Sequence, residues 1–197
     1  MTVKRLLLAL GATALVVLVA IGLVQLGASS TPPKLRPLSV AEMRARLVGS
    51  PAPLAALHAQ AGEIVSGGAS ALQARMSSLH GHAVVVNKWA SWCVPCRSEL
   101  GVFQHVSTSD GKQVAFVGID SGDASRAAAQ SFLHSHPLSY PSYYDRSGEL
   151  GTALTQSTFT PVTAFYDARG RLVYTHQGPY LSTAKLETDV RRYALDA

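Results

Sequence analysis

The chain has 197 residues, of which 47% are hydrophobic and 15% are charged, and its formal net charge is +5 at neutral pH. This length suits one globular domain with extensions and excludes two full domains. Lysine and arginine do not gather in a run with interleaved aromatic residues. The weak basic excess therefore argues against a nucleic-acid partner and fits a domain near an anionic membrane surface.

Residues 1–28 are predicted to be a signal anchor that crosses a membrane once. Lys4 and Arg5 precede an apolar run from Leu6 to about Gly27. About 22 residues at ~1.5 Å each span roughly 33 Å, which crosses a bilayer core and exceeds the usual core of a signal peptide. The charges before the run place the domain outside the cytoplasm. A cleaved signal peptide and a buried core helix are the alternatives.

A tether is expected at 29–47 and a single folded domain at 48–197. The tether is rich in proline and small polar residues as far as Pro37, which favours an extended chain. A short helix is predicted near its end, at 40–47.

The first part of the domain contains two strands that are predicted to be buried. Residues 54–66 are expected to be extended or to form a hairpin, and 70–79 has the apolar spacing of a helix. The run at 83–89 is continuously apolar and β-branched, which is typical of a central strand covered on both faces. A second such strand is predicted at 114–119.

Further helices and short extended pieces complete the middle of the chain. Helices are predicted at about 96–106, 124–134 and 147–154, with an extended piece at 140–144.

The C-terminal part is predicted to form a hairpin and a closing helix. The hairpin pairs 161–166 with 171–176, and the amphipathic helix at 182–193 begins at Ser182, whose side chain can cap it. The order strand-helix-strand-helix-strand-strand-helix predicts an α/β fold whose mixed central sheet has helices on both faces.

The two cysteines of the chain, Cys93 and Cys96, lie three positions apart between a predicted strand and a predicted helix. Free amides at a helix N-terminus favour an anion, so the pKa of the Cys93 thiol would fall to roughly 3.5–7.5. Cys93 would attack a substrate disulfide, and Cys96, one turn along the helix, would then release the product. Val94 and Pro95 stiffen the loop between them.

A metal site is the rival interpretation of this motif. A Cys-x-x-Cys pair is often half of a zinc site, and histidines such as His80 and His82 could complete a zinc or copper site. The chain has no second cysteine pair, so redox exchange without metal or cofactor is favoured.

The segment at 85–96, Val-Val-Asn-Lys-Trp-Ala-Ser-Trp-Cys-Val-Pro-Cys, resembles the active-site strand and loop of the TlpA/ResA-like branch of thioredoxins. The resemblance extends over about 48–195 and includes the segments at 49–53 and 160–167. It implies a thioredoxin-like fold with an N-terminal extension and a central helical insertion. It also implies a thiol-disulfide oxidoreductase that is tethered outside the cytoplasmic membrane.

The resemblance implies a substrate-docking loop beside the cysteines. A cis peptide bond is expected between Thr160 and Pro161, with the backbone of Thr160 free to pair with an incoming peptide. Trp92 is expected to line the substrate groove together with Val94 and Pro95.

Acid–base groups are assigned by the same resemblance. Asn87 lies where many thioredoxins carry a proton-shuttling aspartate, and an amide cannot take that role. Glu99, one turn after Cys96, is expected to influence the cysteine pKa values and to accept a proton during exchange.

Two positions depart from the family pattern. Lys88 replaces an aromatic residue, and its stem is expected to pack while its amine reaches solvent or pairs with Glu99. Gly101 replaces a common proline, which puts the usual helix kink in doubt.

The expected protein is therefore a single-pass membrane protein whose domain lies on the extracytoplasmic side. It would exchange disulfides with exported proteins, such as apocytochrome c during cytochrome c maturation, and take electrons from a membrane thiol carrier. A disulfide-forming oxidase of secreted proteins is the alternative direction.

Overall fold

The computed structural model describes residues 35–197. The predicted signal anchor at 1–28 and the first part of the predicted tether lie outside the described residues. Among the residues that are described, no helix is long and apolar enough to cross a membrane.

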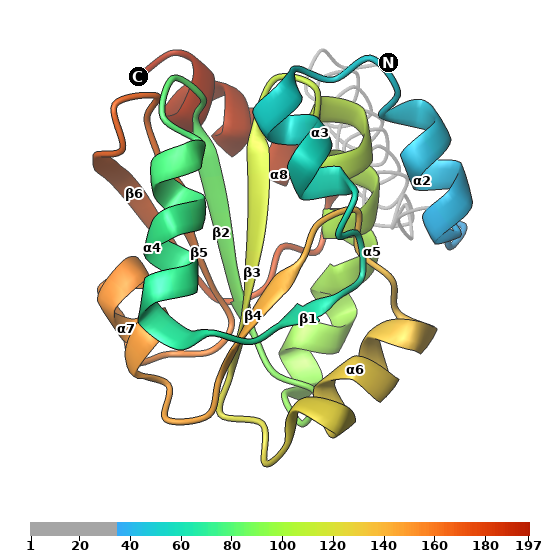
Figure 1. The fold of residues 1–197 in the computed structure, drawn as a ribbon, viewed down its shortest axis with the longest axis vertical. Coiled ribbons are helices and arrows are strands. Elements are labelled where there is room, and N and C mark those ends of the chain that lie inside the picture. The colour runs from blue at the N-terminus through green and yellow to red at the C-terminus, as the bar shows by residue number, and fades with distance from the viewer. Residues whose placement is uncertain (1–34) are drawn as a thin grey trace, which may run out of the picture. The chain divides into compact units, whose positions relative to one another are not determined.

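A mixed β-sheet of six strands forms the centre of the described chain (Figure 1). The strands are β1 (Ile64–Val65), β2 (Val84–Trp89), β3 (Ala115–Ser121), β4 (Ser142–Asp145), β5 (Val162–Tyr166) and β6 (Leu172–Gln177). They lie in the order β1-β4-β3-β2-β5-β6, with β5 and β6 antiparallel to their neighbours and the remaining pairs parallel. The predicted mixed sheet is confirmed.

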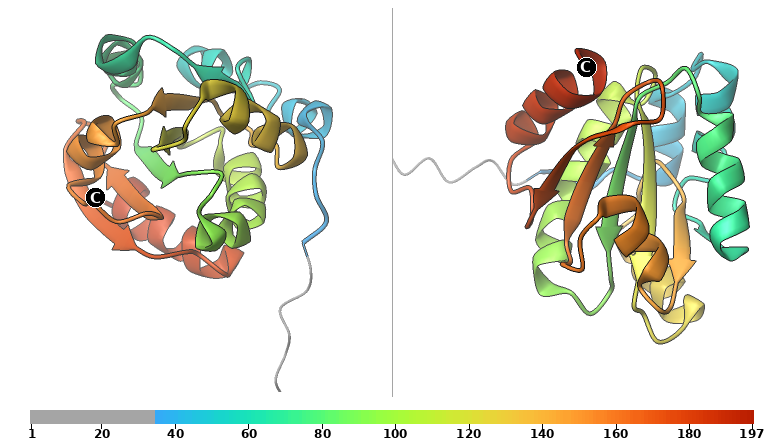
Figure 2. Two further views of the ribbon diagram at one scale, coloured as in Figure 1. Left: turned by 90° about the horizontal axis from the view of Figure 1, so that it is seen from below. Right: turned by 90° about the vertical axis from the view of Figure 1, so that its left-hand side faces the viewer.

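Helices cover both faces of this sheet (Figure 2). The helices are α2 (Val40–Arg46), α3 (Ala52–His58), α4 (Gly68–Ser78), α5 (Val94–Asp110), α6 (Arg126–Ser135), α7 (Glu149–Thr155) and α8 (Thr183–Val190), with a π-helical turn η1 (Arg191–Leu195) after α8. Helices α5, α6 and α8 contribute to the core on one face, whereas α3, α4 and α7 contribute to the core on the other. Helix α2 packs beside α5.

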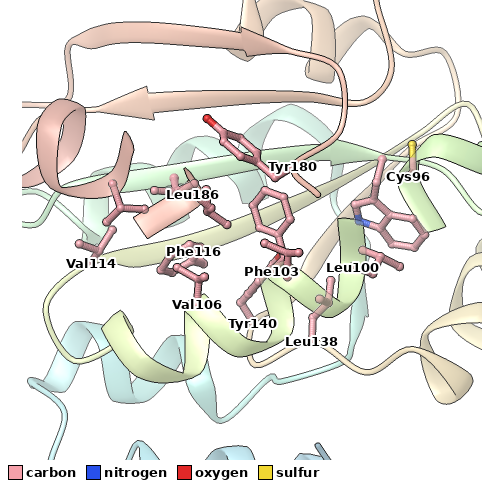
Figure 3. Packing of buried hydrophobic residues seen from close by; sticks show 14 of the residues in the cluster. Cys96, Leu100, Phe103, Val106, Val114, Phe116, Leu138, Tyr140, Tyr180 and Leu186 are labelled. Carbon is pink, nitrogen blue, oxygen red and sulfur yellow. The ribbon is translucent and has the colours of Figure 1, made fainter. Parts of the chain in front are cut away.

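The core on the α5 face is rich in aromatic rings (Figure 3). Phe103 of α5 meets Tyr180 edge-on with ring centroids 6.1 Å apart, and Phe116 of β3 stacks on Tyr140 at 5.9 Å. Cys96 belongs to the same cluster. The first turn of α5 is therefore packed directly on the core, which gives the cysteine pair a rigid support.

Strand β2 is buried along its whole length, as its apolar run predicted. Val85 and Trp89 face the α5 side, whereas Val84 and Val86 face the α7 side. This alternation follows from the two-residue period of a strand. It places Asn87 and Lys88 on opposite faces of the sheet.

The expectation of an extended or hairpin region at 54–66 is wrong for most of that range. The chain forms helix α3 at Ala52–His58, and the strand β1 is confined to Ile64–Val65. Alanine and leucine favour a helix, and Pro53 falls in the first turn, where proline is tolerated. Leu54 and Leu57 are buried against the sheet, which decides in favour of the helix.

Helix α5 is longer than the sequence predicted and runs unbroken through Gly101. The apolar spacing did not predict this continuation, because several buried positions on it carry polar side chains, namely Gln104, Ser107 and Thr108. The predicted side-chain cap of α8 is also wrong. Ser182 occupies the N-cap position, but its side chain makes no capping hydrogen bond.

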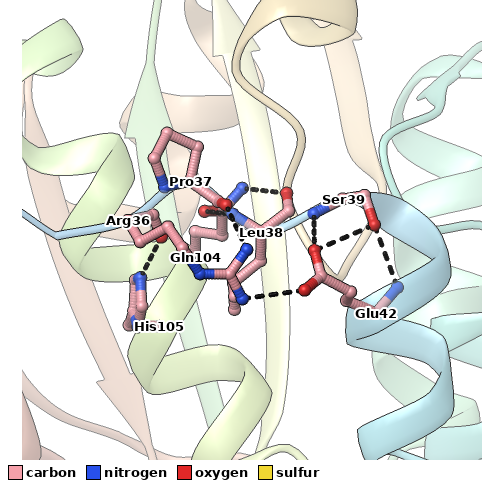
Figure 4. A network of polar contacts seen from close by, with 7 residues as sticks. All are labelled: Arg36, Pro37, Leu38, Ser39, Glu42, Gln104 and His105. Atoms are coloured by element: carbon pink, nitrogen blue, oxygen red, sulfur yellow. Dashed lines mark hydrogen bonds and ion pairs between the residues drawn. The ribbon is translucent and has the colours of Figure 1, made fainter.

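Gln104 joins α5 to the segment that precedes α2 (Figure 4). Its Nε2 donates to the carbonyls of Leu38 at 3.0 Å and Pro137 at 2.7 Å, and its Oε1 accepts from the Leu38 N–H at 2.7 Å. Part of the predicted tether is therefore packed into the domain, because Leu38 and Met43 are both buried.

Replacing this amide should destabilise the domain. In Gln104→Met the side-chain volume is kept, but the buried N–H and C=O of Leu38 and the Pro137 carbonyl lose their partner. Each unpaired buried group costs about 1–3 kcal/mol, so the loss of three partners should lower the free energy of unfolding by about 3 kcal/mol or more. Urea denaturation measures this loss.

His105→Ala is the matched control. The His105 ring contacts the Arg36 carbonyl at 2.8 Å in a more exposed position, where water can replace it. Its loss should cost less than about 1 kcal/mol. Equal losses for the two variants would contradict the role given to Gln104.

Candidate active site

The two cysteines form a disulfide at the junction of β2 and α5. Cys93 is the N-cap residue of α5, its Cα lies 5.3 Å from that of Cys96, and its Sγ accepts a hydrogen bond from the Cys96 N–H at 3.2 Å. The helix thus begins at Val94, slightly earlier than predicted. Cys93 retains 4% exposure, whereas Cys96 has none. Cys93 is therefore the sulfur that a partner can approach.

The loop before Cys93 is fixed by the chain that follows β3. The N–H and hydroxyl of Ser91 both donate to the Asp123 carboxylate, at 3.0 and 2.7 Å. The Trp92 indole N–H donates to the Gly122 carbonyl at 3.1 Å. The Arg97 guanidinium donates to the Ser91 carbonyl at 2.9 and 2.7 Å. These contacts orient the residues that surround the disulfide.

The Thr160–Pro161 peptide bond is cis, as the resemblance implied. Val162 pairs with Lys88 in the antiparallel ladder of β5 and β2, so Pro161 comes level with Trp89. The loop before β5 therefore lies at the end of the sheet at which β2 leads into the cysteines.

Exposed apolar side chains occur on both of these loops. Trp92 is 58% exposed and Val94 is 73% exposed, and Pro95 is exposed as well. Phe159, which the sequence analysis did not single out, is 64% exposed on the other loop. An apolar residue two positions before a predicted cis-proline was a signal that could have found it.

Glu99 is fully buried beneath the disulfide. Its Oε1 accepts from the Asn87 amide at 2.8 Å and its Oε2 accepts from the Tyr180 N–H at 3.1 Å. The Asn87 Oδ1 in turn accepts from the Tyr140 hydroxyl at 3.3 Å. Burial raises the pKa of Glu99 to about 8, against the opposing effect of the hydrogen bonds from Asn87 and Tyr180. This carboxyl can therefore gain or lose a proton near neutral pH.

Asp120 is a second buried carboxyl that the sequence analysis did not assign. It is fully buried at the next-to-last position of β3, and neither of its oxygens has a donor among the described residues. Burial, followed by the neighbouring Asp123 carboxylate, raises the pKa of Asp120 to about 9. The carboxyl of Asp120 is therefore protonated at neutral pH.

Lys88 corrects two sequence expectations. Its side chain is 2% exposed, and Nζ donates to the Ser157 carbonyl at 3.0 Å and to the Thr152 hydroxyl at 3.4 Å. The amine does not reach solvent because α7 covers this face of β2. It does not pair with Glu99, which lies on the other face. Burial lowers the pKa of Lys88, and the Asp145 charge opposes that effect.

The histidines proposed for a metal site are not gathered at the cysteines. His80, for example, lies beside Gly170 in the turn between β5 and β6. Across residues 35–197, no group of three or more histidine, cysteine, aspartate or glutamate side chains is arranged to hold a metal ion.

Residues 48–190 match the protein family described as Redoxin. The chain belongs to the Redoxin family. It is 32% identical over 133 residues to the thiol:disulfide interchange protein DsbE of Pseudomonas fluorescens biotype C, with 68% of each chain covered. It is 27% identical over 104 residues to the thiol-disulfide oxidoreductase ResA of Oceanobacillus iheyensis, which covers 53% of this chain.

Among solved structures, the thioredoxin-family thiol:disulfide interchange protein from Chlorobium tepidum is 28% identical with a TM-score of 0.53. That comparison covers 59% of this chain and 83% of the other. A DsbF homologue from Corynebacterium diphtheriae is 26% identical with the same TM-score, over 59% and 75% of the two chains. The resemblance to ResA-like proteins and the thioredoxin-like fold are thus confirmed.

The match does not extend over the whole of the relatives. The chain spans 54% of ResA, 61% of the sporulation thiol-disulfide oxidoreductase A of Bacillus subtilis and 65% of the thioredoxin-like protein YneN of the same organism.

The raised pKa of Glu99 predicts a pH-dependent stability. The folded protein holds the Glu99 proton up to about pH 8, whereas the unfolded chain releases it near pH 4.5. This contribution to the free energy of unfolding is complete below about pH 4.5 and is lost as the pH rises through 8. Urea denaturation of the disulfide form at a series of pH values measures it.

Glu99→Gln isolates this effect. The variant cannot titrate, so its stability should fall less between pH 5 and 9 than that of the wild type, by up to a few kcal/mol. The pKa of Asp120 is raised in both proteins, so its contribution to the free energy of unfolding cancels when the two pH profiles are compared. Parallel pH profiles for the two proteins would contradict the raised pKa of Glu99.

Proposed function

We propose that this protein is a thiol-disulfide oxidoreductase that exchanges disulfides with protein substrates through Cys93 and Cys96. The observation that carries the proposal is a disulfide at a helix N-terminus with one sulfur slightly exposed and the other covered. Membership of the Redoxin family and the names of the relatives ResA and DsbE support it.

The exchange takes place in two steps when the reduced protein meets a substrate disulfide. The Cys93 thiolate, stabilised by the Cys96 N–H and the first turn of α5, attacks one substrate sulfur and expels the other as a thiolate. The Cys96 thiolate then attacks the Cys93 sulfur and releases the second substrate thiolate. Two electrons pass to the substrate, and the Cys93–Cys96 disulfide forms. The reverse sequence oxidises a substrate dithiol.

Glu99 is placed to handle the proton of Cys96 in the second step. It lies one helical turn along α5 and is shielded from water. A carboxyl whose pKa is near 8 is suited to both accepting and returning a proton at neutral pH.

Substrate docking is assigned to the two exposed loops. Within residues 35–197, the backbone N–H and C=O of Thr160 make no backbone hydrogen bond. An extended peptide can pair with Thr160 as an added strand, while Trp92, Val94 and Phe159 contact its apolar side chains.

The cellular setting is part of the proposal. Residues 1–28 anchor the protein as a single membrane span, with the domain on the extracytoplasmic side. A membrane thiol carrier keeps Cys93 and Cys96 reduced, and exported proteins such as apocytochrome c are the substrates. The apolar length of residues 6–27 and the resemblance to ResA-like proteins support this setting.

Cys96→Ser should trap substrates covalently. Without the second thiol, the mixed disulfide between Cys93 and a substrate is not resolved and accumulates. Non-reducing electrophoresis after expression in an exporting bacterium should show adducts that dithiothreitol releases. Cys93→Ser is the matched control and should give fewer adducts, because Cys96 is covered. Adducts in the control but not in Cys96→Ser would reverse the assigned order of attack.

The reduction potential of the Cys93–Cys96 couple should lie well below −200 mV if the protein is a reductase. Equilibration with glutathione or dithiothreitol buffers, followed by thiol labelling, measures it. A value near about −120 mV would instead identify a disulfide-forming oxidase of secreted proteins.

A further inference from the structure

Lys88 is a buried cation that the exchange reaction does not use. It is one of the largest fully buried side chains of the described chain, with 2% exposure. It lies on the face of β2 opposite Asn87, and so on the opposite side of the sheet from Glu99. A lysine is rarely buried in this way unless its ammonium is paired.

The ammonium of Lys88 is directed at the chain that leads to Pro161. Its Nζ donates to the Ser157 carbonyl at 3.0 Å, and the single proton of the Thr155 hydroxyl is shared between that carbonyl at 3.2 Å and the Gly151 carbonyl at 2.7 Å. The Ser157 hydroxyl then accepts from the Phe159 N–H at 3.2 Å. The residues just before the exposed loop are therefore held by side chains rather than by a β-ladder.

The backbone of Lys88 holds the other end of the same segment. Lys88 pairs with Val162, the first residue of β5. The intervening chain carries Phe159, which is 64% exposed, and Thr160, whose backbone is free of backbone hydrogen bonds within 35–197. One residue of β2 therefore fixes both ends of the loop that faces a substrate.

Neighbouring residues leave space for the Lys88 side chain and balance its charge. A Cβ added to Gly151 would lie 3.0 Å from Lys88 Cε and 3.1 Å from Cδ, so glycine leaves space for the stem. The Asp145 carboxylate accepts from the Gly151 N–H at 2.8 Å, and its charge favours the ammonium against the cost of burial. Gly151 of helix α7 thus leaves room for the Lys88 side chain.

We propose that Lys88 is a positioning residue for protein substrates, whose ammonium fixes the Ser157 carbonyl and so presents Phe159 and Thr160 beside Cys93. This inference rests on the proposed exchange of disulfides with protein substrates. A loop held in its binding conformation before the substrate arrives spares the entropy cost of ordering it. Lys88 touches neither the cysteines nor the substrate, so the attack on a disulfide itself is unaffected.

Lys88→Met tests the proposal, because it keeps the length of the side chain and removes the charge and its donors. A synthetic peptide with one intramolecular disulfide flanked by leucines serves as the protein-like substrate, and oxidised dithiothreitol serves as the small one. For the peptide, KM should rise about tenfold while kcat changes by less than about twofold. The rate with oxidised dithiothreitol and the reduction potential of Cys93–Cys96 should stay unchanged.

Two further variants separate positioning from other effects. Lys112→Met removes an exposed positive charge before β3, at the opposite end of the sheet from the cysteines, and should leave the KM for the peptide unchanged. Thr155→Val removes a hydroxyl that is shared between the Gly151 and Ser157 carbonyls, without changing any charge. It should raise the same KM, by less than Lys88→Met does.

Amide hydrogen exchange gives a readout that needs no substrate. In Lys88→Met the N–H of Phe159, which donates to the Ser157 hydroxyl, should exchange faster, while those of Val86 and Val117 in the central strands keep their protection. Unchanged hydrogen exchange at the Phe159 N–H, or equal losses of rate with the peptide and with oxidised dithiothreitol, would overturn the role of Lys88. If the wild-type protein exchanges no disulfide with either substrate, the proposed function is refuted. The amide hydrogen-exchange measurement still decides whether Lys88 holds the loop.

Discussion

Strand β2 is covered on both faces, so its successive side chains enter different halves of the core. Asn87 enters the α5 half and donates to Glu99 beneath the disulfide. Lys88 enters the α7 half and donates to Ser157 before the docking loop. The strand then ends at Trp89 and leads into Cys93. The chemical and the docking parts of the site are therefore fixed by adjacent residues of one strand, and neither can shift without the sheet.

Buried ionisable groups gather where β2 and β3 end, and each is accommodated differently. Glu99 has two donors, yet burial still raises its pKa to about 8. Asp120 has no donor among residues 35–197, and burial, followed by the neighbouring Asp123, raises its pKa to about 9. The ammonium of Lys88 donates to a carbonyl and to a hydroxyl, and the charge of Asp145 is nearby. Such groups reduce stability, and their concentration at the end of the sheet that carries the cysteines is typical of a functional site.

The disulfide itself combines access with support. Cys96 is part of the aromatic cluster with Phe103 and Leu100, so the second sulfur is surrounded by a close-packed core. Cys93 lies at the surface edge of that cluster, between the exposed side chains of Trp92 and Val94. A partner can therefore reach the Cys93 sulfur, whereas the covered Cys96 sulfur reacts only within the protein, when it attacks the mixed disulfide at Cys93.

The sequence by itself determined the cysteine pair and the two central strands, which depend on local patterns, namely a three-residue spacing and a β-branched run. The proline loop and the glutamate after the motif were assigned only by the resemblance of the sequence to a known family. The tertiary structure decided the rest. Whether 52–58 is helical depended on the burial of Leu54 and Leu57 against the sheet, and the direction of the Lys88 amine depended on α7, which is more than 60 residues away in the chain. The roles of Asp120 and Phe159 likewise arise from residues that only folding brings together, since burial and shared hydrogen bonds are properties of the packed chain.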